Sequence, residues 1–290
     1  MICDLCPRHC HALRTETHGE GYCGMPAGIV AAKAMLHHWE EPCLSGTRGA
    51  GCVFFTGCNL GCVYCQNGAI SREHLGKPIT PVRLREIFEE LIGRGAHCID
   101  LVTPSIYSPW IVEALEKPLP VPVVWNCGGY ESVEQLRALE GKVQIYLPDF
   151  KYGDSRLSFD LSKAKNYPEI AISAVEEMLR QVGPCRFGED GLLKSGVIIR
   201  HMVLPGQLEN TRRVIDLVSS RFSSGEVLFS LMSQYTPQNG AKGALSRRIT
   251  GAEYRAAVEY LHACGISDGF LQEKSSAKEE YTPTFDFSGI

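Results

Sequence analysis

Short apolar runs alternate along this chain with stretches in which apolar residues recur every three to four positions. The runs are four to seven residues long and are bounded by glycine, proline, asparagine or aspartate, which is typical of buried strands. Six of them are predicted to be strands: residues 52–55, 98–104, 121–126, 143–147, 197–203 and 227–232.

The stretches with helical periodicity lie between these runs. Thr80-Pro81 begins one of them, and Thr250 with Glu253 forms a capping box at the start of another. Helices are predicted over residues 81–92, 131–139, 168–182, 214–218 and 250–261.

This alternation predicts an α/β fold with a parallel sheet and right-handed crossovers. Six strand–helix units are too few for an ordinary eight-stranded barrel, so we expect an open, partial (β/α)6 TIM-like barrel. Ligands bind at the carboxyl ends of such strands. Several of the predicted strand ends are polar: Thr103, Asn126, Asp149 with Lys151, Arg200 with His201, and Ser233 with Gln234.

Two regions are expected: residues 1–50 as an N-terminal cysteine-rich metal-binding extension with its lead-in, and residues 51–290 as the partial barrel with a C-terminal extension. The extension has too few apolar residues for a core of its own, so we expect a bound metal to stabilise its fold. The possible ligands are four cysteines, Cys3, Cys6, Cys10 and Cys23. They could bind zinc, a second 4Fe-4S cluster or no metal.

Composition narrows the function classes. The net charge is −4 and no long basic run exists, so nothing supports nucleic-acid binding. We expect a cytoplasmic protein without membrane contact, because no apolar stretch reaches about 18 residues. Thirteen cysteines in short spacings fit metal ligation in a reducing compartment, and oxygen is expected to inactivate the protein, which implies anaerobic function.

The strongest chemical signal follows the run at residues 52–55. Cys58, Cys62 and Cys65 have the spacing C-x3-C-x2-C and place three thiolates within reach of one inorganic cluster. A cubane needs four ligands, so one iron would stay open for a substrate. Chance buried cysteines or zinc ligands are the alternative. The flanking glycines, Tyr64 and the preceding strand favour the cluster.

Other polar residues suggest a binding pocket. Residues 37–42, which include His38, Glu40 and Glu41, either line such a pocket or form a solvated loop. Together with Lys151, Arg200 and His201 they suggest a polar, anionic group in the barrel mouth.

The cysteine motif resembles the signature of the radical S-adenosylmethionine (radical SAM) superfamily, in which S-adenosylmethionine chelates the open iron and is cleaved to a 5′-deoxyadenosyl radical. From residue 51 onward the chain is most similar to the pyruvate formate-lyase activating enzyme-related group of glycyl-radical-enzyme activases. The matching segments are Phe-Phe-Thr-Gly-Cys, Cys-Gln-Asn, Leu-Val-Thr-Pro, Tyr-Leu-Pro-Asp-Phe-Lys, Ile-Arg-His-Met-Val-Leu-Pro-Gly and Ser-Gln-Tyr-Thr-Pro.

The resemblance implies roles for individual residues. Asp149 and Lys151 match an Asp-x-Lys beside S-adenosylmethionine and the incoming glycine loop, and with His201 they form the expected catalytic set. Tyr64 would lie beside the adenine and Asn126 near the methionyl group or ribose. Thr103 stands where such activases have Gly-Gly-Glu, and their ferredoxin-like insertion is missing.

Three hypotheses for function follow. The first is an activase that forms a glycyl radical on a partner, the second a radical SAM catalyst acting on another peptide or a small molecule, and the third a non-catalytic iron–sulfur or zinc protein that docks a partner. The enzyme hypotheses imply a low-potential electron donor such as flavodoxin or ferredoxin.

Overall fold

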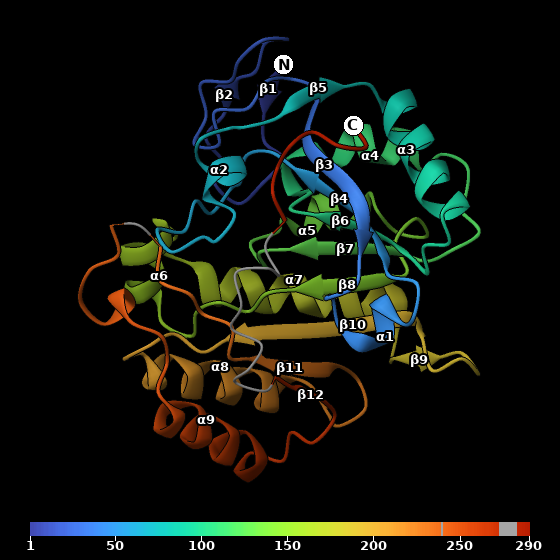
Figure 1. Cartoon of the computed structure of the whole chain (residues 1–290). Coiled ribbons are helices and arrows are strands. Elements are labelled where there is room, and N and C mark those ends of the chain that lie inside the picture. Colours follow the sequence, from blue (N-terminus) through green and yellow to red (C-terminus); the bar gives the residue numbers. More distant parts are fainter. Residues whose placement is uncertain (239, 273–282) are drawn as a thin grey trace.

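The computed structural model describes residues 1–238, 240–272 and 283–290, and one large twisted sheet forms its centre (Figure 1). Neighbouring strands follow the order β12-β11-β10-β8-β7-β6-β4-β3-β5. Seven of them run parallel: β4 (Ala50–Phe55), β6 (Ile99–Val102), β7 (Val123–Cys127), β8 (Ile145–Pro148), β10 (Leu193–Met202), β11 (Leu228–Met232) and β12 (Gly269–Leu271). The six predicted strands are therefore confirmed, and β12 adds a short seventh.

The other strands are antiparallel. β3 (Ile29–His37) pairs with both β4 and β5 (Lys77–Ile79), β9 (Arg186–Phe187) pairs with β10, and β1 (Ile2–Cys3) forms a separate ribbon with β2 (Ala12–Leu13). Among the described strands the path ends at β12 and β5, which do not pair with each other. The sheet is thus an open α/β structure, as predicted.

Helices pack on the outer face of the sheet. They are α1 (Pro42–Ser45), α2 (Gly68–Ser71), α3 (Pro81–Gly93), η1 (Ser105–Tyr107), α4 (Ser108–Ala114), α5 (Val133–Arg137), α6 (Ser155–Ser162), α7 (Tyr167–Val182), α8 (Leu208–Arg221), η2 (Gly243–Ser246) and α9 (Gly251–Ala263), of which α1 and α2 instead contribute to the inner face. The capping box predicted for Thr250 and Glu253 is present at α9. No helix in the described part of the chain is long and apolar enough to cross a bilayer.

Alternate residues of each strand face two different cores. Ile99 and Leu101 of β6 pack outward with α3 residues such as Phe88. On the inner face, Cys52, Phe54 and other inward residues pack with Cys43 and Leu44 of α1. Some residues of this inner core, among them Phe54 and Ile70, also line a cavity at the carboxyl ends of the strands.

Residues 29–37 belong to the predicted lead-in between the cysteine-rich extension and the sheet, and no strand was predicted for them. These residues form β3, whose backbone pairs with β4 in the main sheet. The C-terminal segment also runs along β3: the Ala34 amide donates to Ser288 O at 2.9 Å, and Lys33 Nζ lies 2.8 Å from Asp286 Oδ1. Three alanines in β3 have low strand propensity, which hid the strand in the sequence. The division into two domains remains a prediction.

Candidate functional site

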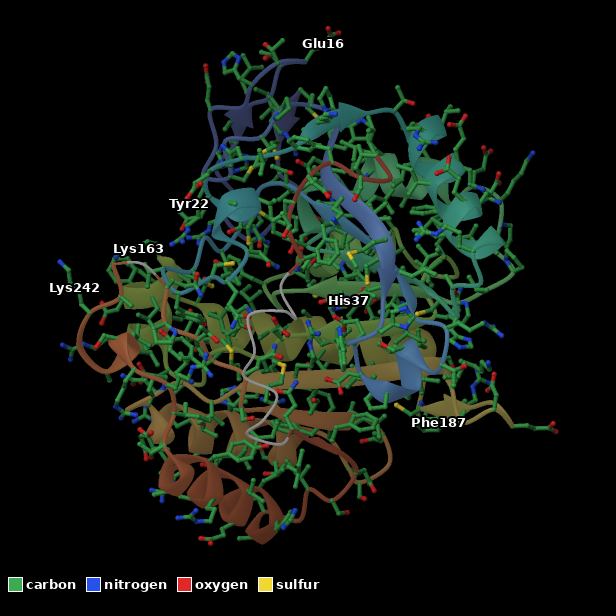
Figure 2. All side chains as sticks on the ribbon, in the orientation of Figure 1. Glu16, Tyr22, His37, Lys163, Phe187 and Lys242 are labelled. Carbon is green, nitrogen blue, oxygen red and sulfur yellow. The ribbon has the colours of Figure 1, made fainter. Side chains whose placement is uncertain are left out.

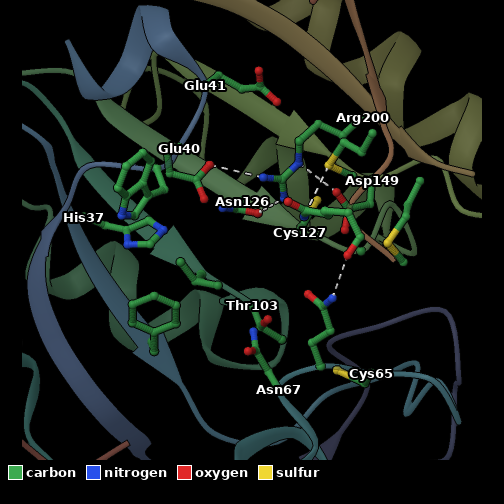
Figure 3. A pocket seen from close by; sticks show the side chains of 18 of the residues that line it. His37, Glu40, Glu41, Cys65, Asn67, Thr103, Asn126, Cys127, Asp149 and Arg200 are labelled. Atoms are coloured by element: carbon green, nitrogen blue, oxygen red, sulfur yellow. Dashed lines mark hydrogen bonds and ion pairs between the residues drawn. The ribbon is translucent and has the colours of Figure 1, made fainter. Parts of the chain in front are cut away.

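A cavity of about 780 Å³ opens at the carboxyl ends of the parallel strands. Its wall combines the cysteine loop, the turn between β3 and α1, and strand-end residues such as Asn126 and Arg200 (Figure 3). The volume lies in the range of about 300–1,000 Å³ that is usual for small-molecule sites. Residues 37–42 line this cavity, so of the two alternatives left open for that segment the pocket lining is correct.

The cysteine loop leaves β4 and places all three motif cysteines on the cavity wall: Cys58, Cys62 and Cys65. Gly57 and Gly61 have φ of 79° and 58°, in the left-handed region that glycine adopts without cost. A Cβ on Gly61 would also lie 3.0 Å from the Tyr22 hydroxyl. The flanking glycines therefore allow the tight turns that bring the three thiols to one cavity.

Each of the three sulfurs accepts a hydrogen bond. The Leu60 amide donates to Cys58 Sγ at 3.3 Å, Ser71 Oγ to Cys65 Sγ at 3.4 Å, and Ser162 Oγ to Cys62 Sγ at 2.9 Å. The Tyr152 hydroxyl lies 3.7 Å from the same Cys62 sulfur.

Burial favours the protonated form of Cys58 and Cys65 when no metal is bound. It raises the pKa of Cys58 to about 12 and also raises that of Cys65, with the charge of Cys62 adding to both shifts. A bound metal centre would deprotonate them, and the donors are already in place for thiolates. The three residues thus fit an iron–sulfur cluster with one open position.

The hydrogen bond from Ser162 predicts a measurable effect on redox chemistry. Donors to cluster sulfurs stabilise the more negative, reduced form and raise the reduction potential. Ser162→Ala is therefore expected to shift the midpoint potential of the cluster to a lower value in an anaerobic redox titration followed by EPR. The exposed Ser220→Ala serves as the control. A potential that stays unchanged in Ser162→Ala would show that this contact does not tune the cluster.

Opposite the cysteines, Arg200 holds a cluster of polar side chains together (Figure 3). Its Nε donates to Asp149 Oδ1 at 2.8 Å, its Nη1 to Glu40 Oε2 at 3.1 Å and its Nη2 to Asn126 Oδ1 at 2.6 Å. Lys151 Nζ lies 2.6 Å from the other oxygen of Asp149. One guanidinium therefore joins residues from β7, β8, β10 and the turn after β3.

The ionisable groups of this cluster differ in how burial and neighbouring charges together shift their pKa values. Burial is the largest effect on Asp149 and would raise its pKa, but Arg200 and Lys151 together lower it, so the carboxylate is ionised. Burial would likewise lower the pKa of Lys151, and Asp149 reverses this. For Glu40, burial dominates over Arg200 and, with Asp100 and other acids nearby, raises the pKa to about 8.

The raised pKa of Glu40 predicts a pH dependence of stability. Between its unfolded pKa of 4.5 and about 8, the folded protein binds a proton that the unfolded chain has released. The free energy of unfolding therefore falls as pH rises through this window. Glu40→Gln, which resembles the protonated form, removes this contribution.

The measurement is the melting temperature of metal-loaded Glu40→Gln relative to the wild type, and the difference should move in favour of the variant from pH 5 to pH 8. The exposed Glu116→Gln provides the matched control. A difference that is constant across this range would contradict the assignment.

Tyr64 and Thr103 also line the cavity. The Tyr64 ring is buried and lies 6.4 Å and 6.3 Å, between ring centroids, from Tyr152 and Tyr235. Thr103 has φ of 62°, a left-handed conformation that is costly for a β-branched residue, and its amide donates to Asn126 O at 2.8 Å. Strain of this kind is concentrated at functional sites in proteins.

The prediction that His201 faces the barrel mouth is wrong. Its side chain is fully buried, Nδ1 lies 2.7 Å from Phe150 O, and Nε2 lies 3.0 Å from Thr211 Oγ1 of α8. Burial lowers the pKa of His201 to about 4. Side chains alternate along a strand, so His201 points away from the cavity that its neighbour Arg200 enters.

Some residues of the site gave no signal in the sequence. Asp100 is one of them, and its Oδ2 accepts a hydrogen bond from Asn126 Nδ2 at 3.2 Å. Among the described residues, Asp100 Oδ1 is the one buried polar side-chain atom without a partner. Ser162 and Tyr152 come from a segment that was not predicted to be helical. Only tertiary contact brings them to Cys62.

Fold and site together define an α/β protein with an open, largely parallel sheet and three cysteines on the wall of a substrate-sized cavity. A family model described as the radical SAM superfamily matches residues 52–218. The chain belongs to the radical SAM superfamily. It is therefore an enzyme of a family that uses a 4Fe-4S cluster and S-adenosylmethionine.

The chain is also similar to several individual proteins. An uncharacterised protein of Methanocaldococcus jannaschii is 31% identical over 272 residues, which cover 89% of this chain and 73% of the relative. A radical SAM methyltransferase from Sphaerobacter thermophilus has a TM-score of 0.52 at 16% identity, over 77% of this chain and 66% of the methyltransferase. Streptococcus suis SuiB, bound to its precursor peptide SuiA, has a TM-score of 0.53 at 12% identity, over 75% of this chain and 47% of SuiB.

The chain thus spans about two thirds of the methyltransferase and about half of SuiB. At these identities the two solved structures show a shared fold.

Proposed function

We propose that this protein cleaves S-adenosylmethionine reductively and abstracts a hydrogen atom from a glycine of a protein or peptide partner. When bound, a 4Fe-4S cluster at Cys58, Cys62 and Cys65 and S-adenosylmethionine supply one electron and a sulfonium, which yield methionine and a 5′-deoxyadenosyl radical. The supporting observation is that the three cysteines and the polar cluster around Arg200 face one cavity.

The residues of the polar cluster bind and orient the sulfonium cofactor. Lys151 and Arg200 provide the two cations of this wall, and they suit the carboxylate of its methionyl group. Asp149 contacts both cations and fixes their positions. Asn126 lies beside Arg200 and would contact the ribose or methionyl group, while Tyr64 lines the space for the adenine. Thr103 lines the same cavity at the position where the resembling activases hold the amino group.

The cavity wall also limits access of water to the reacting atoms. Phe54 and Met232 provide apolar surface between the polar groups, and Phe270 lies on the same wall. A radical intermediate requires such exclusion of side reactions. The residues of the chain therefore position the cofactor and shield the reacting atoms from water, and the bound cofactors supply the chemistry.

Glycine as the target rests on the match of Asp149 and Lys151 to the Asp-x-Lys of glycyl-radical-enzyme activases. Another peptide position or a small molecule is the second candidate, since the cavity is large enough for either. In both cases a low-potential donor of the flavodoxin or ferredoxin class provides the electron.

Anaerobic assays separate these possibilities. Reconstituted protein with dithionite and S-adenosylmethionine should form 5′-deoxyadenosine and methionine. Mixing with candidate glycyl-radical enzymes should then produce an EPR doublet on the partner. Turnover without a doublet on any partner would favour another substrate, and a lack of any 5′-deoxyadenosine would refute the proposal.

A further inference from the structure

The backbone that carries the four N-terminal cysteines is closely folded. Strand β1 pairs with β2 so that Cys3 lies opposite Ala12, and a Cβ on Gly21 would lie 3.2 Å from the Cβ of Ala12. A Cβ on Gly21 would lie 2.9 Å from Cys10 Sγ, so the sulfur of Cys10 approaches the backbone two residues before Cys23. Cys3 and Cys6 are buried although this segment has almost no core of its own. The short segments that carry the four cysteines thus lie beside one another.

A buried arginine beside these thiols has no anionic partner. Arg14 is 1% exposed, and its hydrogen-bond acceptors among the described residues are carbonyl oxygens and the Cys3 sulfur, with no carboxylate. Its guanidinium donates to three carbonyl oxygens, those of Met25, Pro26 and Ile106, at 2.5–3.1 Å. Arg14 Nη1 also lies 3.8 Å from Cys3 Sγ.

An uncompensated buried charge costs several kcal/mol, so charged side chains are almost never fully buried without a partner. Carbonyl oxygens satisfy the donors of a guanidinium but not its charge. Four thiolates around a doubly positive metal core carry excess negative charge. A metal centre at the four cysteines would therefore supply the anion that Arg14 lacks.

A second arginine attaches this region to the cysteine loop of the active site. Arg8 lies between Cys6 and Cys10, and its Nε donates to Asn59 O at 2.7 Å. Tyr22, labelled in Figure 2, precedes Cys23, and its hydroxyl donates to Leu60 O at 2.9 Å.

The Arg8 guanidinium lies 3.7 Å from the centre of the Tyr22 ring, so the two contacts form one unit. Asn59 and Leu60 belong to the turn between the first two cysteines of the radical motif. Arg8 and Tyr22 thus hold the N-terminal segment against the loop that carries Cys58 and Cys62.

We propose that Cys3, Cys6, Cys10 and Cys23 hold a second, redox-active iron–sulfur cluster, with Arg14 as its buried counter-charge and Arg8 and Tyr22 as its attachment to the radical loop. A donor of the flavodoxin or ferredoxin class transfers one electron to this cluster, which becomes more negative by one charge. No bond forms or breaks in this step. The position against the radical loop makes it suitable as the point of electron entry. Zinc would fit four thiolates equally but carries no electrons.

The first test removes the radical site and leaves the N-terminal site intact. The triple variant Cys58→Ala/Cys62→Ala/Cys65→Ala, reconstituted anaerobically, should retain about four iron and four sulfide per chain and give a reducible EPR signal. The wild type should contain about eight of each. Because this variant cannot cleave S-adenosylmethionine, its metal content is independent of the proposed function.

Zinc, or no metal, in a triple variant with a normal circular dichroism spectrum would overturn the proposal. The reciprocal variant Cys3→Ala/Cys6→Ala should lose about four iron and keep the signal of the other cluster. If it kept all its iron, the N-terminal assignment would be wrong.

The second test measures the role of Arg14 in the triple-variant background. Removal of a buried positive charge disfavours the reduced, more negative cluster, so Arg14→Met should lower its midpoint potential. Arg14→Lys keeps the charge and should preserve most of the potential, and the exposed Arg156→Met should change nothing. A potential in Arg14→Met equal to that of the parent would overturn the counter-charge role. If Arg14→Met does not fold, Arg14→Gln carries the same prediction.

Discussion

Cys62→Ala is expected to abolish the formation of 5′-deoxyadenosine and to lower the iron content of the protein. Cys62 is buried, and its sulfur accepts a hydrogen bond from Ser162 at 2.9 Å. Loss of groups that merely contact a metal ligand costs 10–100-fold in metal affinity or activity, so removal of the ligand itself should cost more than about 100-fold. The measurement is product formation with dithionite and S-adenosylmethionine under strictly anaerobic conditions.

The chain offers a matched control for this substitution. Cys264 follows α9 and does not line the cavity, and its sulfur lies 3.9 Å from Asp216 Oδ1. Cys264→Ala should therefore retain wild-type iron and turnover. Full turnover in Cys62→Ala would refute the assignment of the cluster to this loop.

Arg200→Met is expected to weaken binding of S-adenosylmethionine strongly and also to destabilise the fold. Removing one partner of a buried, hydrogen-bonded charge pair costs about 2–5 kcal/mol, partly because the other charge is left unpaired. Here the substitution leaves the carboxylate of Asp149 with Lys151 alone and removes a donor from Asn126 and Glu40. Anaerobic equilibrium titration should show at least a tenfold increase in Kd, which is about 1.4 kcal/mol.

Two further variants separate binding from stability. In Arg200→Met/Asp149→Asn the unpaired carboxylate is removed, so the melting temperature should recover in part while the affinity stays low. Arg200→Lys keeps the charge but cannot reach three acceptors at once, and it should be intermediate. An unchanged Kd in Arg200→Met would show that this guanidinium does not contact the sulfonium cofactor.

Much of the fold could be predicted because each parallel strand is a short apolar run bounded by turn residues. The run at residues 227–232 and the capping box at Thr250 are found as expected in β11 and α9. β3 was missed because alanines and a lysine interrupt its apolar pattern. α4 and α6 were missed because helices of seven and eight residues contain too few turns to show a period.

The site was predictable to the extent that spacing encodes it. Two residues apart on one extended segment, Asp149 and Lys151 point to the same side, and both line the cavity. The same alternation sends Arg200 and His201 to opposite faces of the sheet. Adjacent residues of a strand cannot both enter the cavity, so the strand pattern itself argues against His201 in the barrel mouth. The contact of Glu40 with Arg200 joins residues 160 positions apart and depends on the folded topology.

EPR of the chemically reduced protein, recorded with and without S-adenosylmethionine, tests the central claim most directly. An open iron at Cys58, Cys62 and Cys65 predicts a cubane signal that changes its g-values when the sulfonium cofactor is added, while Cys62→Ala lacks this response. A cubane signal that is the same before and after addition, or no cubane at this site in freshly reconstituted protein, would contradict the claim.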